Sequence, residues 1–453
     1  MAKKKLRFGC AGGYLEGRLE PGLLLARDGK CDYLGLEALN EASLSVLQRA
    51  KEADPATGYH VRGVQSVAAL VDAMRTDKTR IATSIGGANP ASGAQALDAQ
   101  LKSKDKRRSI AFVEGDNLTD RMGAFVARGI ATWGNGKKLK PADLQGVFAA
   151  SAYLGGVPIA QGFGLGADIV MTGRVVDSAL YLGPAIHEFG WSEEDIDQLA
   201  GASVAGHLLE CAGHLVGGNY WGPGWTRIDY RRIGHGIAEV RHDGQVEVTK
   251  HAKASGLITR HTVAQQLLYE VGDPSRYILP DVVVNVSDVD LLQVGPDRVR
   301  VDGVKGAKAP PTFKVLLSKR AGFIAEGLAT FTWPDALLKA ERARDSLAWR
   351  LQHRHGLREF RIDLLGGGAL TPVKNADRAT LQEVTLRVAA ADPVAEVANV
   401  VHAELANFYD CAPAGACGIA GPTAGSRSAP RERIEIKGCY VPRSEINPSV
   451  QLV

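Results

Sequence analysis

The chain has 453 residues, more than a single domain usually contains, and its 45% hydrophobic and 23% charged residues are typical of a globular protein. Its formal net charge of +4 is too small to indicate nucleic-acid binding. No segment reaches the roughly 18 consecutive apolar residues of a membrane span, and no signal-peptide core follows the first lysines. We therefore expect a cytoplasmic protein that binds neither membranes nor nucleic acids. The cysteines form no C-x-x-C pair, which predicts reduced thiols.

Short apolar runs followed by glycine-rich or polar loops recur through residues 1–190, with helical segments between them. The runs are Leu6–Cys10, Cys31–Glu37, Arg80–Ile85, Ser109–Val113 and Ile169–Met171. This alternation predicts an α/β fold with a doubly wound, mainly parallel sheet. Because ligands bind outside the carboxyl ends of such strands, we expect the residues after the runs to share one pocket.

The loop after the first run contains Gly12 and Gly13, and glycines let backbone amides approach an anion such as a phosphate. The loop lacks the G-x-G-x-x-G spacing of a dinucleotide site, and a tight turn without a ligand explains it equally well. Cys10 precedes these glycines, where amide dipoles can lower the pKa of a thiol, so it is a candidate nucleophile. Glu37 ends the second run and is a candidate substrate-binding carboxylate.

The third and fourth runs also end in polar residues. Gly87 and Asn89 follow the third run, and Asn89 can either hydrogen-bond a substrate oxygen or cap the next helix. Glu114 and Asp116 follow the fourth run as a carboxylate pair around a glycine. They can bind substrate or be solvated acids in a turn.

The fifth run is followed by Arg174 and Asp177, three residues apart where the chain turns into a helix. They can hold an anionic substrate together, or they can pair with each other and brace the turn. We favour substrate binding, because the position at a strand end matters as much as the charge.

A helical segment at 191–211 places His207, Glu210, Cys211 and His214 on one face. His207 and Glu210 form a candidate acid–base pair, whereas His207, Cys211 and His214 have spacing compatible with zinc. A packed helix whose imidazoles bond to neighbours is the third possibility. Asn219 lies in the glycine-rich aromatic loop that follows, which can line a pocket or cover the edge of the core.

The second half of the chain is richer in strand patterns. Residues 237–249 predict a hairpin turning at Asp243-Gly244, and 303–311 is the best candidate for a linker. We therefore predict an α/β domain at 1–302 and a smaller α+β two-layer domain at 312–453. In the latter, 312–317 and 323–332 read as a strand pair. The loop at 409–418 either folds over the site of the first domain or simply connects packed elements.

Several motifs occur in an order that resembles the acyclic terpene utilisation AtuA-like family over nearly the whole chain. They are Phe8–Gly13, Asp32–Leu34, Gly87–Pro90, Glu114–Asp116, Ala152–Gly155, Ala167–Val175 and Gly206–Cys211. The resemblance adds Tyr153 to the expected substrate-binding residues. It includes His207, Glu210 and Cys211 but does not require His214, so we expect no metal. It implies a role in the breakdown of acyclic terpenoids through carboxylated, branched acyl-CoA intermediates.

Together these features predict a catabolic enzyme acting on a branched carboxylic acid or acyl-CoA, namely a lyase of the hydratase type. Arg174 would anchor a carboxylate, Asp177 would orient the guanidinium, and His207 with Glu210 would transfer a proton. Amides near Gly12, Gly13 and Gly87 would stabilise an enolate.

No cofactor is evident, apart from CoA as part of the substrate. The partners expected are a small-molecule substrate and further copies of the chain in a homo-oligomer. A thiol-dependent acyl transferase or hydrolase, and a non-catalytic subunit of a catabolic complex, are the alternatives.

Overall fold

The computed structural model describes residues 5–14, 17–76, 78–420 and 430–453. It divides into two compact units, which we call unit 1 (Met1–Ser318 and Ile436–Val453) and unit 2 (Lys319–Glu435). The sequence-based boundaries, 1–302 and 312–453, are placed differently, because the chain returns to unit 1 for its last residues. The segment at 303–311 belongs to unit 1 and contains a short strand, β14 (Lys305–Ala307).

Unit 1 contains a ten-stranded mixed sheet. Its centre consists of five parallel strands in the order β1 (Lys5–Gly12), β2 (Tyr33–Leu36), β3 (Arg80–Thr83), β7 (Ile169–Thr172) and β4 (Ile110–Glu114). Antiparallel strands extend the sheet beyond β1 with β8 (Gly236–Arg241), β9 (Val246–Lys250), β13 (Arg298–Asp302) and β12 (Asp290–Gly295), and beyond β4 with β20 (Ser449–Leu452). The prediction of a mainly parallel, doubly wound sheet is therefore not confirmed: the five predicted runs are parallel, and hairpins and the C-terminal strand make the sheet mixed.

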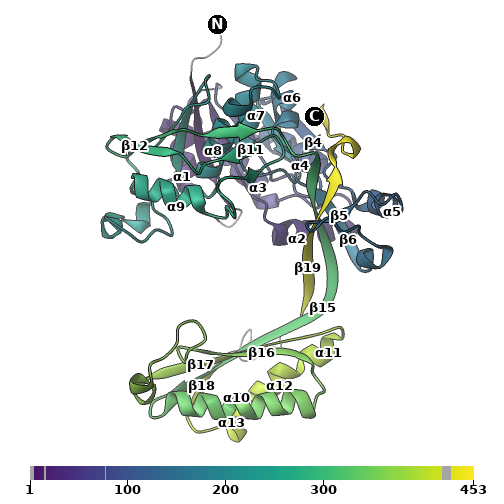
Figure 1. The fold of residues 1–453 in the computed structure, drawn as a ribbon, viewed down its shortest axis with the longest axis vertical. Helices are drawn as coiled ribbons and strands as arrows, with labels where there is room; N and C mark the ends of the chain where they lie inside the picture. Colours follow the sequence, from purple (N-terminus) through teal and green to yellow (C-terminus); the bar gives the residue numbers. More distant parts are fainter. Residues whose placement is uncertain (1–4, 15–16, 77, 421–429) are drawn as a thin grey trace. The chain divides into compact units, whose positions relative to one another are not determined.

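The central strands are buried on both faces, because successive side chains of a strand point to opposite sides. Leu34, Ile81 and Met171 join a core with α1 (Glu20–Asp28), α3 (Val61–Ala73) and α4 (Pro90–Ser103). The ribbons of these three helices are labelled in Figure 1. Their neighbours Ala82 and Val170 join the main core with α6 (Val157–Gly164), α7 (Ala179–Phe189) and α8 (Ile196–Glu210). This double coverage explains why the central strands read as continuous apolar runs.

The rest of unit 1 surrounds this sheet. A three-stranded sheet of β10 (Tyr277–Ile278), β11 (Val283–Asn285) and β14 packs on α8. The remaining helices are α2 (Glu41–Ala53), α5 (Met122–Ala127) and α9 (Arg260–Leu268). Strand β5 (Thr132–Trp133) pairs with the last part of β19 (Arg431–Pro442), and β6 (Val147–Ala152) pairs with β15 (Thr312–Thr332).

Unit 2 is an α+β arrangement on an antiparallel sheet, in the order β16 (Glu359–Leu365), β17 (Glu383–Asp392), β15 and β19, with β18 (Ala416–Ala420) also pairing with β15. Its core joins the sheet to α10 (Ala336–His353) and α12 (Val400–Ala406), for example through Leu386, Leu347 and Val401. The strand pair predicted at 312–332 is wrong, because these residues form one continuous strand. Residues 395–411 form three short helices, α11 (Ala395–Ala398), α12 and α13 (Phe408–Cys411).

Unit 2 also contains a buried charge cluster. Glu404 on α12 is 3% exposed, and its carboxylate accepts from Arg350 Nη2 at 3.0 Å and lies 2.6 Å from His355 Nε2. Arg350 on α10 thus covers the buried carboxylate of Glu404 while its own side chain stays 33% exposed. Across the described part of the chain, none of the helices combines the length and apolar character needed to span a membrane.

Candidate functional site

A cavity of about 380 Å³ in unit 1 brings charged and aromatic side chains together. Its lining comes from the start of α2, the ends of β6 and α8, the turn after β7, the segment at 270–280 and the start of β15. Carboxylates, cations and tyrosines share this surface with apolar residues: Glu41, Asp177, Glu210 and Glu270; Arg174, Arg276 and Lys314; Tyr153, Tyr277 and Tyr440. The volume lies within the range of small-molecule sites, roughly 300–1,000 Å³.

Arg174 is the buried cation of this cavity and is only 3% exposed. Its Nη1 donates to the carbonyl of Leu39 and lies 3.3 Å from Asp177 Oδ1, and its guanidinium carbon lies 4.2 Å from the centre of the Tyr153 ring. Its Nε has no hydrogen-bond partner among the residues described. An unpaired buried donor costs about 1–3 kcal/mol, which favours any rearrangement of the site that brings an acceptor to this atom.

Asp177 and Glu37 place two further acids beside this guanidinium. Burial raises the pKa of Asp177 to about 7, against the opposing attraction of Arg174, and the carboxylate of Glu210 raises it further. Burial and the charge of Asp177 hold the pKa of Glu37 well above its ordinary value, and its Oε1 accepts from the amide of Leu39. Asp177 lines the cavity, whereas Glu37 does not, so Glu37 influences the site through Asp177 and Arg174.

His207 and Glu210 form the expected pair at the end of α8. Nδ1 of His207 lies 3.0 Å from Glu210 Oε1, and Nε2 lies 3.2 Å from the carbonyl of Leu267. Since a carbonyl can only accept, Nε2 carries a proton, and one further proton is shared between Nδ1 and the carboxylate. Burial lowers and Glu210 raises the pKa of His207, with a net increase. Only Glu210 lines the cavity.

The glycines of the first loop serve packing in this structure. A Cβ on Gly13 would lie 2.4 Å from the carbonyl oxygen of Glu210, so only glycine lets this loop approach the end of α8. The carbonyl of Gly12 accepts from the amide of Glu37 at 2.9 Å. Neither residue lines the cavity, and the predicted anion-binding role for their amides has no support from the geometry.

The polar residues after the third and fourth strands brace turns. Asn89 caps α4 by accepting from the amide of Ser92, and its amide group donates to the carbonyls of Pro55 and Thr57, at 2.9 and 2.7 Å. Gly87 has a φ of +58° in the preceding turn, which glycine adopts readily. Of the two explanations for Asn89, the geometry favours the helix cap.

Asp116 is buried, and its Oδ2 accepts from the backbone amide of Arg174 at 2.9 Å. It therefore fixes the turn that presents the Arg174 side chain, and burial raises the pKa of Asp116 to about 6. Glu114 pairs with Ser449 at the end of β4 and, like Asp116, does not line the cavity.

Cys10 is fully buried, and burial raises the pKa of its thiol to about 12. The expectation that amide dipoles lower this pKa is therefore contradicted, because desolvation outweighs the amide contacts. Cys211 shows the same effect and also has a pKa of about 12, chiefly because of burial.

The proposed zinc spacing is lost because α8 ends at Glu210, and His214 packs against Tyr269 with ring centres 5.1 Å apart. Within the described ranges, no group of three or more histidine, cysteine, aspartate or glutamate side chains is arranged to hold a metal. Asn219 lies outside the cavity, and its carbonyl accepts from Gln265 Nε2 at 2.8 Å.

Four predicted residues, Tyr153, Arg174, Asp177 and Glu210, thus meet at the cavity. Sequence reasoning missed Glu41, whose Oε1 accepts from the Tyr153 hydroxyl at 2.5 Å. It also missed Glu270, Arg276, Tyr277 and Lys314, which come from segments outside the five strand ends. Glu270 has a positive φ of +62°, which is unusual for a residue other than glycine. This backbone feature is visible only in the structure, so the sequence offered no signal for Glu270.

Comparisons with known proteins place the chain by family. No curated protein and no solved structure gives a significant match. The family model described as "Acyclic terpene utilisation family protein AtuA" matches residues 6–452, which confirms the resemblance seen in the motifs. The chain therefore belongs to the acyclic terpene utilisation family AtuA, and this membership implies involvement in acyclic terpene utilisation.

Proposed function

We propose that the cavity around Arg174 is the active site of a catabolic hydratase, a lyase that adds water to a branched, α,β-unsaturated acid or its CoA thioester during acyclic terpenoid breakdown. The observation that carries the proposal is the buried Arg174 Nε without a partner, in a cavity that Asp177 and Glu210 also line. A carbonyl oxygen of the ligand would accept from this donor. The developing negative charge would then lie against a buried cation, where electrostatic stabilisation is strong.

The carboxyl groups of Glu210 and Asp177 are in different environments, which suits one to act as the base and the other as the acid. Glu210 is hydrogen-bonded to His207, which fixes the orientation of this carboxyl group toward the cavity. Asp177, with a pKa of about 7, carries a proton in a substantial fraction of molecules at neutral pH.

In the proposed reaction, Glu210 takes a proton from water while the water oxygen bonds to the β-carbon of the ligand. The electron pair of the double bond moves through the α-carbon to the carbonyl oxygen, giving an enolate that Arg174 holds. Asp177 then donates its proton to the α-carbon. Proton exchange with solvent returns Glu210 and Asp177 to their starting states, so the reaction needs no redox step and no cofactor beyond CoA in the thioester.

The surface of the cavity fits such a ligand. Val176, Leu279 and Phe313 offer apolar surface to a branched hydrocarbon. Arg276 and Lys314 are exposed and form no ion pair in the part of the chain that the structure describes. They would attract an anionic ligand toward the cavity.

The thiol mechanism has less support. Cys10 and Cys211 both have pKa values of about 12, so their reactive thiolate forms are scarce at neutral pH. Neither residue lines the cavity. The hydratase proposal is therefore preferred to an acyl transferase or hydrolase.

To test the proposal, the protein is incubated with dimethylacrylic and geranic acids and their CoA thioesters in water labelled with a heavy oxygen isotope. Mass spectrometry should detect a β-hydroxy product carrying the label. Glu210→Gln and Asp177→Asn should each lower kcat by about a hundredfold or more, since acid–base groups typically contribute about 10²–10⁴. Glu114→Gln, outside the cavity, is the matched control and should retain activity. Saturable binding without labelled product would reject the hydratase and favour a non-catalytic binding subunit.

A further inference from the structure

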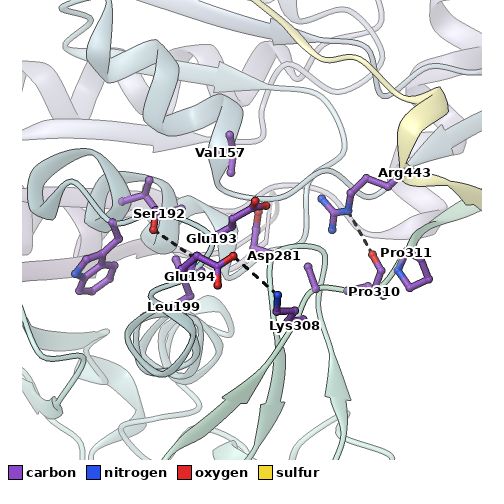
Figure 2. Close-up of a pocket in the computed structure, with 13 residues that line it drawn as sticks. Val157, Ser192, Glu193, Glu194, Leu199, Asp281, Lys308, Pro310, Pro311 and Arg443 are labelled. Carbon is purple, nitrogen blue, oxygen red and sulfur yellow. Dashed lines mark hydrogen bonds and ion pairs between the residues drawn. The ribbon is translucent and has the colours of Figure 1, made fainter.

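Unit 1 has a second and larger cavity, of about 530 Å³. It is formed by the start of α6, the inner side of α7 and α8, the segment at 191–194 and the segment at 308–311. Figure 2 shows Arg443, from the C-terminal part of the chain, at one side of it and Glu194 with Lys308 on another. Nothing in the reaction proposed above uses this space.

The second cavity meets the candidate site at Pro310 and Pro311, which line both. Arg443 holds this shared wall from the second-cavity side: it donates to the carbonyls of Pro310 and Pro280. Its guanidinium also lies 4.4 Å from the ring centre of Phe313, which lines the candidate site. The two cavities are thus neighbours that share a short proline segment as part of their lining.

The polar side chains of the second cavity are largely paired within the protein. Asp281 accepts from the amide of Gly156 at 2.8 Å, and the donors of Arg443 go to the proline carbonyls. Glu194 and Lys308 pair with each other at 3.9 Å, with side chains 70% and 79% exposed, which places them at the mouth (Figure 2).

Ser192, whose hydroxyl is bonded to Asp195, and Glu193 also line the cavity, and its apolar surface comes from Val157, Ile186, Trp191, Leu199 and Ala309. A ligand group in this cavity would gain from burying hydrocarbon. It would gain little from a polar group, because few protein partners are free and burying an unpaired polar group is unfavourable.

We propose that the second cavity receives the hydrocarbon chain of the ligand whose carboxyl or thioester end lies beside Arg174. This inference rests on the function proposed above and specifies its substrate class. The ligand has an acyclic, branched chain long enough to extend past Pro310 and Pro311 from the first cavity into the second. The second cavity then selects ligands by chain length, whereas the first acts on the common unsaturated end.

The experiment uses three acids with the same branched, unsaturated end, each longer than the previous one by a five-carbon unit: dimethylacrylic, geranic and farnesoic acids. Each is tested as the free acid and as the CoA thioester by isothermal titration calorimetry. Ala309→Trp and Val157→Trp fill the second cavity from two different walls. Leu165→Trp is the matched control, since it adds the same ring at an exposed position near the end of α6 and outside the cavity.

We expect both filling variants to weaken binding of the longest ligand by about tenfold or more, because lost methylene contacts in an apolar pocket have effects of that size. Binding of dimethylacrylate should change by less than about twofold in either variant, and Leu165→Trp should match the unsubstituted protein. Equal affinities for the long ligands in all variants would overturn the second-cavity assignment while leaving the Arg174 site intact. Failure of every ligand to bind the unsubstituted protein would overturn both proposals.

Discussion

The imidazole of His207 lies behind the candidate site: its Nδ1 is 3.0 Å from Oε1 of Glu210, and its ring packs against that of Tyr277 with ring centres 5.2 Å apart. The other ring nitrogen is occupied by the carbonyl of Leu267, and the ring is buried. We therefore regard His207 as a positioning residue, which orients Glu210 and does not itself line the cavity.

His207→Gln should lower kcat by at least about tenfold, roughly 1.4 kcal/mol of barrier, while leaving ligand affinity nearly unchanged. The physical reason is that Glu210 loses the hydrogen bond that orients its carboxyl group. The measurement is kcat and KM determined separately for the variant and the unsubstituted protein. A rise in KM with an unchanged kcat would contradict this assignment and indicate a structural role.

Asp177→Asn should change the pH dependence of stability. The pKa of Asp177 is raised from 3.8 to about 7, so between these values the folded protein binds the proton more tightly than the unfolded chain. Stability contributed by this proton is complete below about pH 4 and is lost as pH rises toward 7, at most about 1.4 kcal/mol per pH unit. Urea unfolding across this range should show the variant gaining stability relative to the unsubstituted protein. Parallel curves for the two proteins would disprove the raised pKa.

Gly13→Ala should destabilise unit 1, whereas Gly12→Ala should be tolerated. A Cβ at position 13 meets the carbonyl of Glu210 at 2.4 Å, but at position 12 its nearest neighbour is the Leu36 side chain at 3.7 Å. The overpacking cost at Gly13 is about 1–3 kcal/mol. Thermal and urea unfolding of both variants would measure it, and equal losses at the two positions would refute the packing role.

Arg350→Met should destabilise unit 2, because it removes one of the two side chains, Arg350 and His355, that contact the buried carboxylate of Glu404. The expected loss in the free energy of unfolding is about 1–3 kcal/mol. Arg344→Met provides the control, since Arg344 pairs with the exposed Asp345 and such pairs contribute about 0–1 kcal/mol. Amide hydrogen exchange of peptides from α10 and α12 during urea unfolding can follow unit 2. Similar losses in the two variants would show that burial of Glu404 does not matter.

Iodoacetamide should discriminate between the thiols of the folded protein. Cys411 and Cys417 are exposed, whereas Cys10 is buried and burial raises its pKa to about 12. Peptide mass spectrometry at neutral pH should therefore find label at Cys411 and Cys417, and at Cys10 only after unfolding. Rapid labelling of Cys10 in the folded protein, with loss of ligand binding, would revive the thiol mechanism.

The sequence was informative wherever local pattern and burial coincide. Each apolar run before residue 190 became a parallel strand, because a strand covered on both faces needs an unbroken apolar stretch. Arg174 and Asp177 were found because they follow such a strand directly. The same logic overestimated Gly87 and Asn89, since a residue at a strand end can equally well brace a turn.

The missed part of the site depends on contacts between distant segments. Tyr153 and Glu41 are hydrogen-bonded although they lie 112 residues apart in the sequence, so no local spacing could predict this pair. Lys314 belongs to the 21-residue strand β15. Polar residues in the middle of this strand led to the prediction of two separate strands. For Cys10 the local sequence was misleading: the glycines that follow it suggested a thiol with a lowered pKa. Burial by packing from distant segments instead raises the pKa of this thiol to about 12.

The order of the strands also affects how the chain can mature during synthesis. Strand β4 is synthesised early, and one of its edges pairs with β7. Its other edge pairs with β20, which begins only at Ser449. A nascent chain thus exposes unpaired backbone groups on β4 until β20 has been synthesised, and such edges promote intermolecular pairing. Removal of β20 would leave the residues of the candidate site in place but take away the strand that closes this edge.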